Sequence, residues 1–371
     1  MKELLKKLIN APSTLEKGEV ETAMIAAEFL RKHNVQCQVD EWAPNRANLI
    51  AKIPSKREKK PLLFVGHLDV VPEGQGNWKT PPYKATESEG KIFGRGAADM
   101  KAGLASVLHT AAWISDNNIE LTGDLIIAAT AGEETDSCGI KRFVEKNIPQ
   151  FSPLEAVIIP EPTDLEIMTA HRGFLWVEIT TIGKTAHGSM PQLGINAIES
   201  MTKFLKELKS LPIDSVIDPV LGSGSLSINK INGGNAANVI PDKCSVQIDI
   251  RMVPGLEYTD IISNIEKIFE KIRSDDNNFQ ASLKVIRQVP PLFTDPNCDF
   301  VCRIKDVLAK SGTKTVGFTT DAPFLAKLGS PVIILGPGSP GMCHQPDEFV
   351  EITQMDKAFE YYKKIVIEML T

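Results

Sequence analysis

The chain has 371 residues, of which 42% are hydrophobic, and a formal net charge of −6. This length can form a large buried core and indicates two or three domains. The acidic balance argues against general binding to nucleic-acid phosphates, which requires a basic surface.

Residues 1–9 predict an amphipathic helix rather than a signal peptide, because charged residues interrupt a short apolar stretch. No window approaches the roughly 18 apolar residues that a membrane span needs. The six cysteines lack the paired spacing of a metal site and are expected to be reduced. We therefore expect a cytoplasmic protein that binds neither membranes nor nucleic acid.

Helical patterns alternate with short apolar runs over most of the chain. Residues 19–31 and 102–114 have the composition and periodicity of helices. Four apolar runs bounded by Gly or Pro predict buried strands; they cover residues 62–66, 125–132, 156–160 and 331–336. This alternation indicates an α/β fold with a mixed or parallel central sheet and covering helices.

The pattern changes at residue 174. Residues 174–182 alternate with a period of two, and strands and helices of similar length follow. The expected elements are helices at 196–209 and 258–272 and strands at 225–229, 244–251 and 284–288. Two helices among about four strands predict a compact α+β insert over residues 174–288. Residues 1–173 and 289–371 then form one discontinuous domain.

Acidic or histidine residues follow these apolar runs. They are His67 and Asp69 after the first run, Glu133 and Glu134 after the second, Glu161 after the third and His344 after the fourth. Ligand sites in open α/β sheets form beyond the carboxyl ends of the strands, so these side chains are expected to converge. Two histidines with several carboxylates suit Zn²⁺ or a similar divalent ion.

Spacing suggests separate roles for some of these residues. Asp69 shares a face of an extended segment with His67 and could accept its second N–H. Asp99, in a Gly-rich turn before a helix, is placed to bridge two cations about 3.5–4 Å apart. The adjacent Glu133 and Glu134 are expected to point apart. One could then bind metal while the other accepts a proton from a metal-activated water.

Several motifs resemble those of the co-catalytic zinc amidohydrolase and metallopeptidase family. That family includes acetylornithine deacetylase, succinyl-diaminopimelate desuccinylase, aminoacylase and glutamate carboxypeptidases. The matching stretches are residues 66–72, 94–103, 132–134, 160–163 and 343–348. The resemblance implies a zinc-peptidase-like catalytic domain, whose mixed sheet is flanked by helices, and an inserted ferredoxin-like lid and dimerisation domain.

The resemblance further implies two bound Zn²⁺ ions, for which Co²⁺ or Mn²⁺ could substitute. The implied ligands are His67, Asp99 and Glu161 for one ion, and Asp99, Glu134 and His344 for the other. Glu133 resembles the general base, and Asp69 the partner of His67. A cis peptide bond between Asp99 and Met100 is also implied.

Substrate contacts are implied in the same way. His187 would donate a hydrogen bond to the scissile oxygen across the interface of a homodimer formed through residues 174–288. Asn238 and Arg251 resemble residues that hold the substrate carboxylate, and the planar guanidinium of Arg suits that role. Thr320 is a further candidate for contact with the substrate.

The expected activity is hydrolysis of the amide bond of a small N-acyl amino acid by a metal-activated water, with Glu133 as general base. Residues 249–255, 320–324, 335–339 and 344–348 most resemble acetylornithine deacetylase. Arg172, however, also occurs in desuccinylases, so a desuccinylase or another N-acyl amino acid amidohydrolase remains an alternative. A carboxypeptidase or dipeptidase, a single-zinc hydrolase and a non-enzymatic binding protein are the others.

Overall fold

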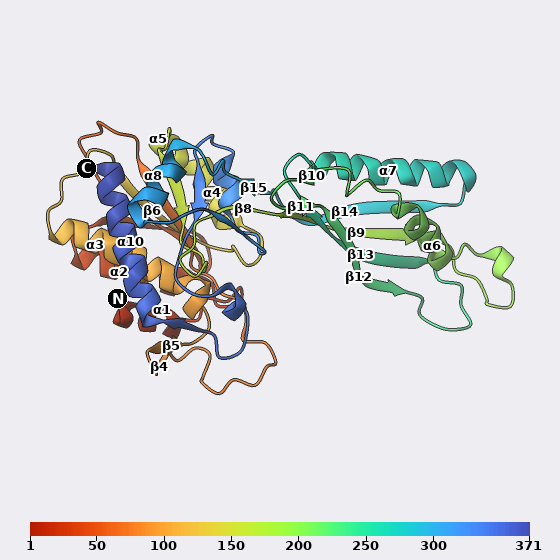
Figure 1. The fold of residues 1–371 in the computed structure, drawn as a ribbon. Helices are drawn as coiled ribbons and strands as arrows, with labels where there is room; N and C mark the ends of the chain where they lie inside the picture. Colours follow the sequence, from red (N-terminus) through yellow and green to blue (C-terminus); the bar gives the residue numbers. More distant parts are fainter. The chain divides into compact units, whose positions relative to one another are not determined.

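The computed structural model describes all residues, 1–371, and the chain divides into two compact units (Figure 1). The first unit comprises Met1–Ala170, Phe293–Val316 and Thr320–Thr371. The second comprises His171–Leu292 and Gly317–Thr319. No helix in either unit combines the length and the apolar character needed to cross a membrane.

A mixed sheet of nine strands forms the centre of the first unit. Its order is β1-β2-β6-β3-β7-β17-β8-β15, with β16 paired to β8. β6, β3, β7 and β17 are parallel, whereas β2 and β8 join this group antiparallel. The strands are β1 (Gln36–Ala43), β2 (Arg46–Ile53), β3 (Leu62–His67), β6 (Leu125–Thr130), β7 (Ala156–Ile159), β8 (Met168–His171), β15 (Leu292–Phe293), β16 (Lys314–Val316) and β17 (Val332–Ile334).

Helices cover both faces of this sheet. α2, α3 and α10 share one hydrophobic cluster with Leu125, Ile127 and Ala129 of β6. The alternating residues Ile126 and Ala128 therefore face the other side, and α4 also contacts β6. The helices of this unit are α1 (Lys2–Asn10), α2 (Val20–Lys32), α3 (Ala102–Asp116), α4 (Cys138–Lys146), α5 (Ile148–Phe151), α8 (Asp299–Leu308), α9 (Ala322–Ala326) and α10 (Ile352–Leu370).

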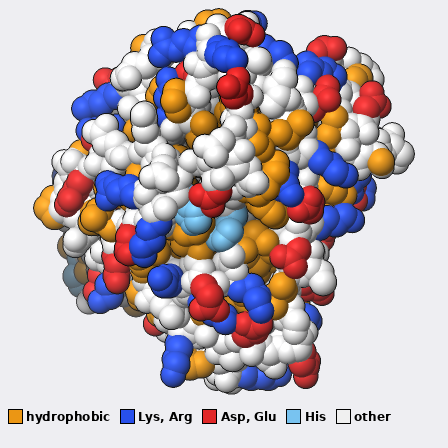
Figure 2. Space-filling model, turned by 90° about the vertical axis from the view of Figure 1, so that its left-hand side faces the viewer, with side chains coloured by type: hydrophobic (Ala, Val, Ile, Leu, Met, Phe, Trp, Pro, Cys, Tyr) orange, Lys and Arg blue, Asp and Glu red, His pale blue; other side chains and the backbone are white.

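Smaller elements complete the first unit. A three-stranded sheet has the order β18-β5-β4, with bounds β4 (Thr86–Ser88), β5 (Lys91–Phe93) and β18 (Phe349–Glu351). An irregular turn, η1 (Ala97–Lys101), leads directly into α3, and a 3₁₀ turn, η3 (Pro340–Met342), precedes β18. On the face of the unit shown in Figure 2, acidic and basic side chains are interspersed.

The second unit is a four-stranded antiparallel sheet with two helices on one face (Figure 1). Its main elements follow the chain order β9 (Gly173–Ile182), α6 (Ala197–Leu208), β12 (Ser225–Gly233), β13 (Lys243–Met252), α7 (Tyr258–Asp275) and β14 (Gln280–Val289). A 3₁₀ turn, η2 (Pro191–Leu193), and the short strands β10 (Ile217–Asp218) and β11 (Gly222–Ser223) lie in its loops. The strand order β12-β13-β9-β14 with this βαββαβ connectivity is ferredoxin-like.

The predicted fold class is confirmed, namely a mixed sheet flanked by helices plus a separate α+β insert. The hairpin of β1 and β2, which contains the outermost strand on one side of the large sheet, was not predicted. β12 and β14 are also longer than the predicted segments at 225–229 and 284–288.

Candidate active site

The side chains predicted to converge lie at the carboxyl ends of the parallel strands in the central sheet. His67 is the last residue of β3, and Glu134 and Glu161 follow the ends of β6 and β7. Because these strands and β17 are parallel, their carboxyl ends lie at the same edge, where α/β folds place their sites. The segment after β17 supplies His344.

One group of potential metal ligands comprises His67, Asp99 and Glu161. The imidazole Nε2 of His67 is 3.1 Å from Oδ1 of Asp99 and 3.5 Å from Oε1 of Glu161. His67 and Glu161 are buried. Close packing of the chain before Glu161 depends on Gly103 and Gly336, since a Cβ atom at either position would overlap the carbonyl oxygen of Pro160.

A second group comprises Asp99, Glu134 and His344. Nε2 of His344 is 3.0 Å from Oε1 of Glu134 and 3.4 Å from Oδ2 of Asp99. Asp99 therefore belongs to both groups and presents a different oxygen to each histidine, as expected of a bridging carboxylate.

The turn that carries Asp99 has an unusual backbone. Gly96 has a φ of 82°, a left-handed conformation that glycine adopts without steric cost. The peptide bond between Asp99 and Met100 is cis, as the resemblance to the amidohydrolase family implied. The backbone N–H of His67 lies 3.2 Å from the sulfur of Met100.

The residues fit a pair of divalent ions. Two ligand atoms bound to one Zn²⁺ at about 2.0–2.2 Å in tetrahedral geometry lie roughly 3.3–3.6 Å apart. The histidine–carboxylate distances of the two groups, 3.0 to 3.5 Å, are close to this range. The ring nitrogen Nδ1 of His67 lies 2.9 Å from the backbone carbonyl of Asp69. When Nδ1–H donates to this carbonyl, Nε2 carries no proton. Nε2 faces the carboxylates of Asp99 and Glu161, where it can bind a cation.

The electrostatics also favour bound cations. Burial acts to lower the pKa of His67, but Glu161, Asp99 and Asp69 raise it well above its usual value. Hydrogen bonds to Asp99 and Glu134 raise the pKa of His344 to about 10. Each histidine therefore lies where a positive charge is stabilised, and a metal ion would supply that charge in place of a proton.

Burial makes Glu133 a stronger base than an ordinary glutamate, and neighbouring carboxylates add to the effect. Burial, followed by the charge of Asp321, raises its pKa well above the usual range. Burial and the charge of Asp99 raise the pKa of Glu134 as well. Asp321 itself is buried and was not among the predicted site residues.

The contact between Asp69 and His67 differs from the prediction. Its carboxylate was expected to accept the second N–H of His67, but it lies 3.7 Å from that nitrogen. The backbone carbonyl of Asp69 takes that position instead, at 2.9 Å. The carboxylate accepts the backbone N–H groups of Glu133 and Glu134, each at 3.1 Å. Two converging amide donors hold the carboxylate away from the imidazole.

In the second unit, His187 and Asn238 lie on neighbouring segments. His187 forms an isolated antiparallel bridge with Val239, and the N–H of Gly188 donates to the carbonyl of Asn238 at 2.7 Å. Nδ1 of His187 accepts the N–H of Ser189 at 3.2 Å. Nδ1 also lies 2.7 Å from the hydroxyl of Ser189. When Nδ1 accepts both hydrogen bonds, the ring N–H is on Nε2.

The other candidate substrate contacts have partners within their own units. Arg251 on β13 forms a 2.8 Å ion pair with Asp249. Thr320 is buried, and its hydroxyl accepts the N–H of Ala322 at 3.1 Å at the start of α9. Arg172, which left the acyl group open, donates to the carbonyl of Leu221 at 2.7 Å.

Sequence reasoning missed the roles of Arg95 and Glu348. Both are buried, and Nη1 of Arg95 is 2.7 Å from Oε2 of Glu348. Their only signal in the sequence was that they lie inside motifs chosen for Asp99 and His344. A pair of buried opposite charges cannot be recognised before the two segments are known to be neighbours.

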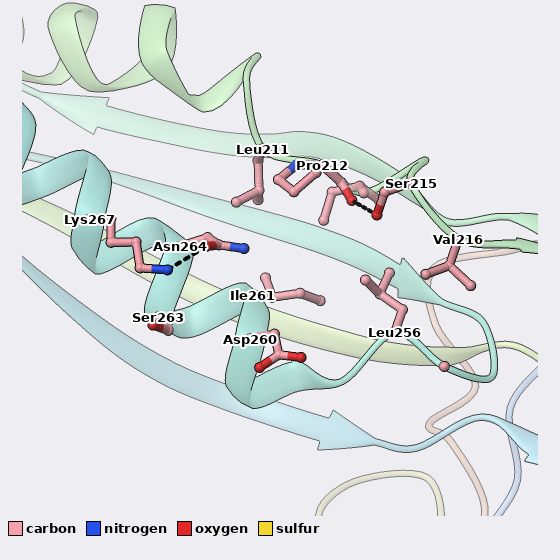
Figure 3. A pocket seen from close by; sticks show the side chains of 12 residues that line it. Leu211, Pro212, Ser215, Val216, Leu256, Asp260, Ile261, Ser263, Asn264 and Lys267 are labelled. Atoms are coloured by element: carbon pink, nitrogen blue, oxygen red, sulfur yellow. Dashed lines mark hydrogen bonds between the residues drawn. The ribbon is translucent and has the colours of Figure 1, made fainter.

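A separate cavity of about 340 Å³ lies within the second unit (Figure 3). The loop after α6 and the first half of α7 line it. Asp260 and Lys267 are its only charged residues, and Lys267 donates to Asn264 at 3.2 Å. None of the predicted site residues lines this cavity.

The sequence model of peptidase family M20/M25/M40 matches residues 63–368. The chain belongs to this family. As a member of the M20/M25/M40 family it is a metal-dependent hydrolase, which confirms the predicted enzyme class.

Two curated relatives carry the names of the expected activities. A probable succinyl-diaminopimelate desuccinylase of Staphylococcus aureus is 30% identical, over 96% of this chain and 94% of its own length. An acetylornithine deacetylase of Buchnera aphidicola is 35% identical, over 78% of this chain and 76% of its own length. The names of these relatives therefore do not decide between an acetyl and a succinyl group.

Solved structures of low sequence identity share the fold. A metallo-carboxypeptidase of the M20 family from Sulfolobus solfataricus has a TM-score of 0.82 at 20% identity, covering 99% of this chain and 98% of that one. An aminopeptidase from Bacillus cereus has a TM-score of 0.79, also at 20% identity, covering 99% of this chain and 97% of that one.

Proposed function

We propose that this M20-family chain hydrolyses the amide bond of a small N-acyl amino acid, with acetylornithine deacetylase as the model for its activity. The observation that carries the proposal is the sharing of Asp99 between two ligand groups, with the basic carboxylate of Glu133 adjacent to one of the ligands. This is an arrangement for activating water against an unreactive amide.

The proposed cofactor is a pair of Zn²⁺ ions, held by His67, Asp99 and Glu161 and by Asp99, Glu134 and His344. When bound, such ions lower the pKa of a water molecule and polarise the carbonyl group of the amide. Co²⁺ and Mn²⁺ accept similar ligands and are expected to substitute.

Glu133 has the chemistry of the general base. Its carboxylate would take a proton from the attacking water and return it to the nitrogen that leaves as the amine. The two N–H bonds from the Glu133–Glu134 segment to Asp69 would keep the base in place during both transfers. His187 would stabilise the charge on the scissile oxygen through its Nε2–H.

Substrate recognition is proposed for the second unit, with residues 174–288 as the lid and the surface of a homodimer. Asn238 and Arg251 would hold the carboxylate of the amino acid. For this, Arg251 would have to give up its ion pair with Asp249. A substrate carboxylate bound by two hydrogen bonds can take the place of Asp249. Thr320 is proposed as a further substrate contact.

A hydrolysis screen tests the proposal. We would assay N-acetyl and N-succinyl amino acids and dipeptides with added Zn²⁺, Co²⁺ or Mn²⁺. The proposal requires release of the free amino acid from at least one N-acyl series and much slower cleavage of peptides. Turnover of peptides alone would replace the deacylase with a peptidase on the same scaffold.

A further inference from the structure

Glu348 is fully buried, and each of its two carboxylate oxygens accepts two hydrogen bonds. Oε1 accepts the backbone N–H groups of Ala98 at 2.9 Å and Asp99 at 3.0 Å. Oε2 accepts the N–H of Gly96 at 3.1 Å and Nη1 of Arg95 at 2.7 Å. A carboxylate has about four acceptor sites, so Glu348 is saturated by the turn that carries Asp99.

Arg95 extends this contact to the segment that carries His344. Its guanidinium donates to the carbonyl oxygens of Gln345 at 3.3 Å and of His344 at 3.5 Å. It also donates to the carbonyl of Pro72 at 3.3 Å and lies 5.0 Å from the ring centre of Trp78. With only 2% of its surface exposed, Arg95 has little freedom to rearrange.

We propose that the Arg95–Glu348 pair is a positioning device for the ion held by Asp99, Glu134 and His344, an inference that rests on the proposed function. The pair fixes the backbone of two of these three ligands relative to each other. Side-chain packing contributes little to the position of His344, because its side chain is 50% exposed. The backbone of His344 also has a φ of 64°, a left-handed conformation that is uncommon for residues other than glycine.

The ion held by His67, Asp99 and Glu161 depends less on this pair. His67 ends the buried strand β3, and Glu161 follows the end of the buried strand β7. Only Asp99 is common to both ions. Loss of the pair is therefore expected to weaken the two sites unequally.

Glu348→Gln is the decisive variant, because it keeps the size of the side chain and removes its charge. The amide nitrogen would oppose a donor, so two of the four hydrogen bonds are lost, and Arg95 is left buried without a counter-charge. Removing a group that orients metal ligands typically weakens metal binding about 10–100-fold. We expect that loss for the second ion and a much smaller one for the first.

Asp347→Asn is the matched control. It makes the same charge change on the adjacent residue, whose carboxylate accepts the N–H groups of Lys79 at 2.8 Å and Thr80 at 3.0 Å. Neither donor belongs to the turn of Asp99, so both metal affinities should match those of the wild type. Arg95→Lys keeps the positive charge without the planar fork and should give a partial loss at the second ion.

The measurement is calorimetric titration of Zn²⁺ into the metal-free full-length protein, with thermal melting as a check of folding. The wild type should bind two ions, and Glu348→Gln should lose affinity selectively for one. If the wild type does not bind two ions, the proposed function fails. If it binds two and Glu348→Gln leaves both affinities unchanged, or lowers both equally, the positioning role is wrong. Should Glu348→Gln not fold, Arg95→Lys decides by the same criteria.

Discussion

The backbone N–H of Glu133 donates to the carboxylate of Asp69 at 3.1 Å. The N–H of Glu134 donates to the other oxygen of the same carboxylate at the same distance. Asp69 thus holds the segment that presents both the proposed base and a proposed metal ligand, while its backbone carbonyl holds His67.

Asp69→Asn should therefore disturb the position of Glu133 more than the orientation of the His67 ring. The amide nitrogen would oppose one of the two N–H donors and displace the loop, whereas the carbonyl that orients His67 is unchanged. We expect kcat to fall about 10–100-fold, the usual scale for an outer partner of a metal site. Steady-state kinetics would measure this.

Asp136→Asn is the control for Asp69→Asn. Asp136 lies in the same loop, and its carboxylate accepts the N–H of Cys138 at 3.1 Å, so neither Glu133 nor Glu134 loses a partner. A near-normal kcat for Asp69→Asn, or an equal loss in both variants, would refute this role of Asp69.

Glu133→Gln should abolish most turnover while metal binding persists. The amide cannot accept a proton from water, and general base catalysis contributes about 10²–10⁴-fold. Glu145→Gln, on the exposed face of α4, makes the same change away from the site and should be silent. Metal analysis together with kcat would distinguish loss of the base from loss of a ligand.

Much of the fold was predictable because hydrophobic pattern determines which face of each element is buried. The apolar runs that became β3, β6, β7 and β17 lie in the middle of a sheet covered on both faces, so they stand out as continuous runs. β12 does not: most of its residues are exposed, and the pattern recognised at 225–229 ended too early. The hairpin of β1 and β2 was missed although Pro44 and Asn45 are turn residues.

The candidate ligands were predictable because strand ends in a parallel sheet place distant motifs together. The partners of those ligands were not. The alternation of an extended segment suggested that the carboxylate of Asp69 faces His67, but two backbone donors from another loop determine its position. The contacts of Glu348 likewise depend on tertiary structure, since Arg95 lies 253 positions away in the sequence.

If His187 acts on the site of a second copy of the chain, activity requires a dimer. His187→Ala should then lower turnover about 10²–10³-fold, the scale of losing one oxyanion donor, with metal content unchanged. Mixing this variant with Glu133→Gln should restore activity, because hybrid dimers contain one site with both groups intact.

The mixing experiment needs proof of subunit exchange, which differently tagged copies provide. A mixture that exchanges subunits but never exceeds the summed activity of its two components would contradict the shared site. Full activity of a strictly monomeric protein in solution scattering would contradict it too.

His109 on α3 should make stability depend on pH. Burial, with the charges of the N-terminus and His33, lowers its pKa to about 4, although a bond to the carbonyl of Ala105 opposes this. Because the folded-state pKa lies below that of the unfolded chain, this stability is present above a pH of about 6.5 and is lost as the pH falls toward 4.

His109→Gln removes this titration. Between pH 7 and pH 5 the wild type should lose roughly 1 kcal/mol more unfolding free energy than the variant, after allowance for the partial exposure of the ring. Urea unfolding of the metal-free proteins at both pH values gives the two differences. Identical differences would show that His109 does not titrate in this range.

The central claim is that two ions, bridged by Asp99, activate water for amide hydrolysis. Its most direct test is to titrate the metal-free protein with Zn²⁺ and follow release of the amino acid from its preferred N-acyl substrate. We predict that activity is negligible without metal and reaches its maximum at two equivalents per chain. A maximum at one equivalent, with no gain from the second, would contradict the two-ion account.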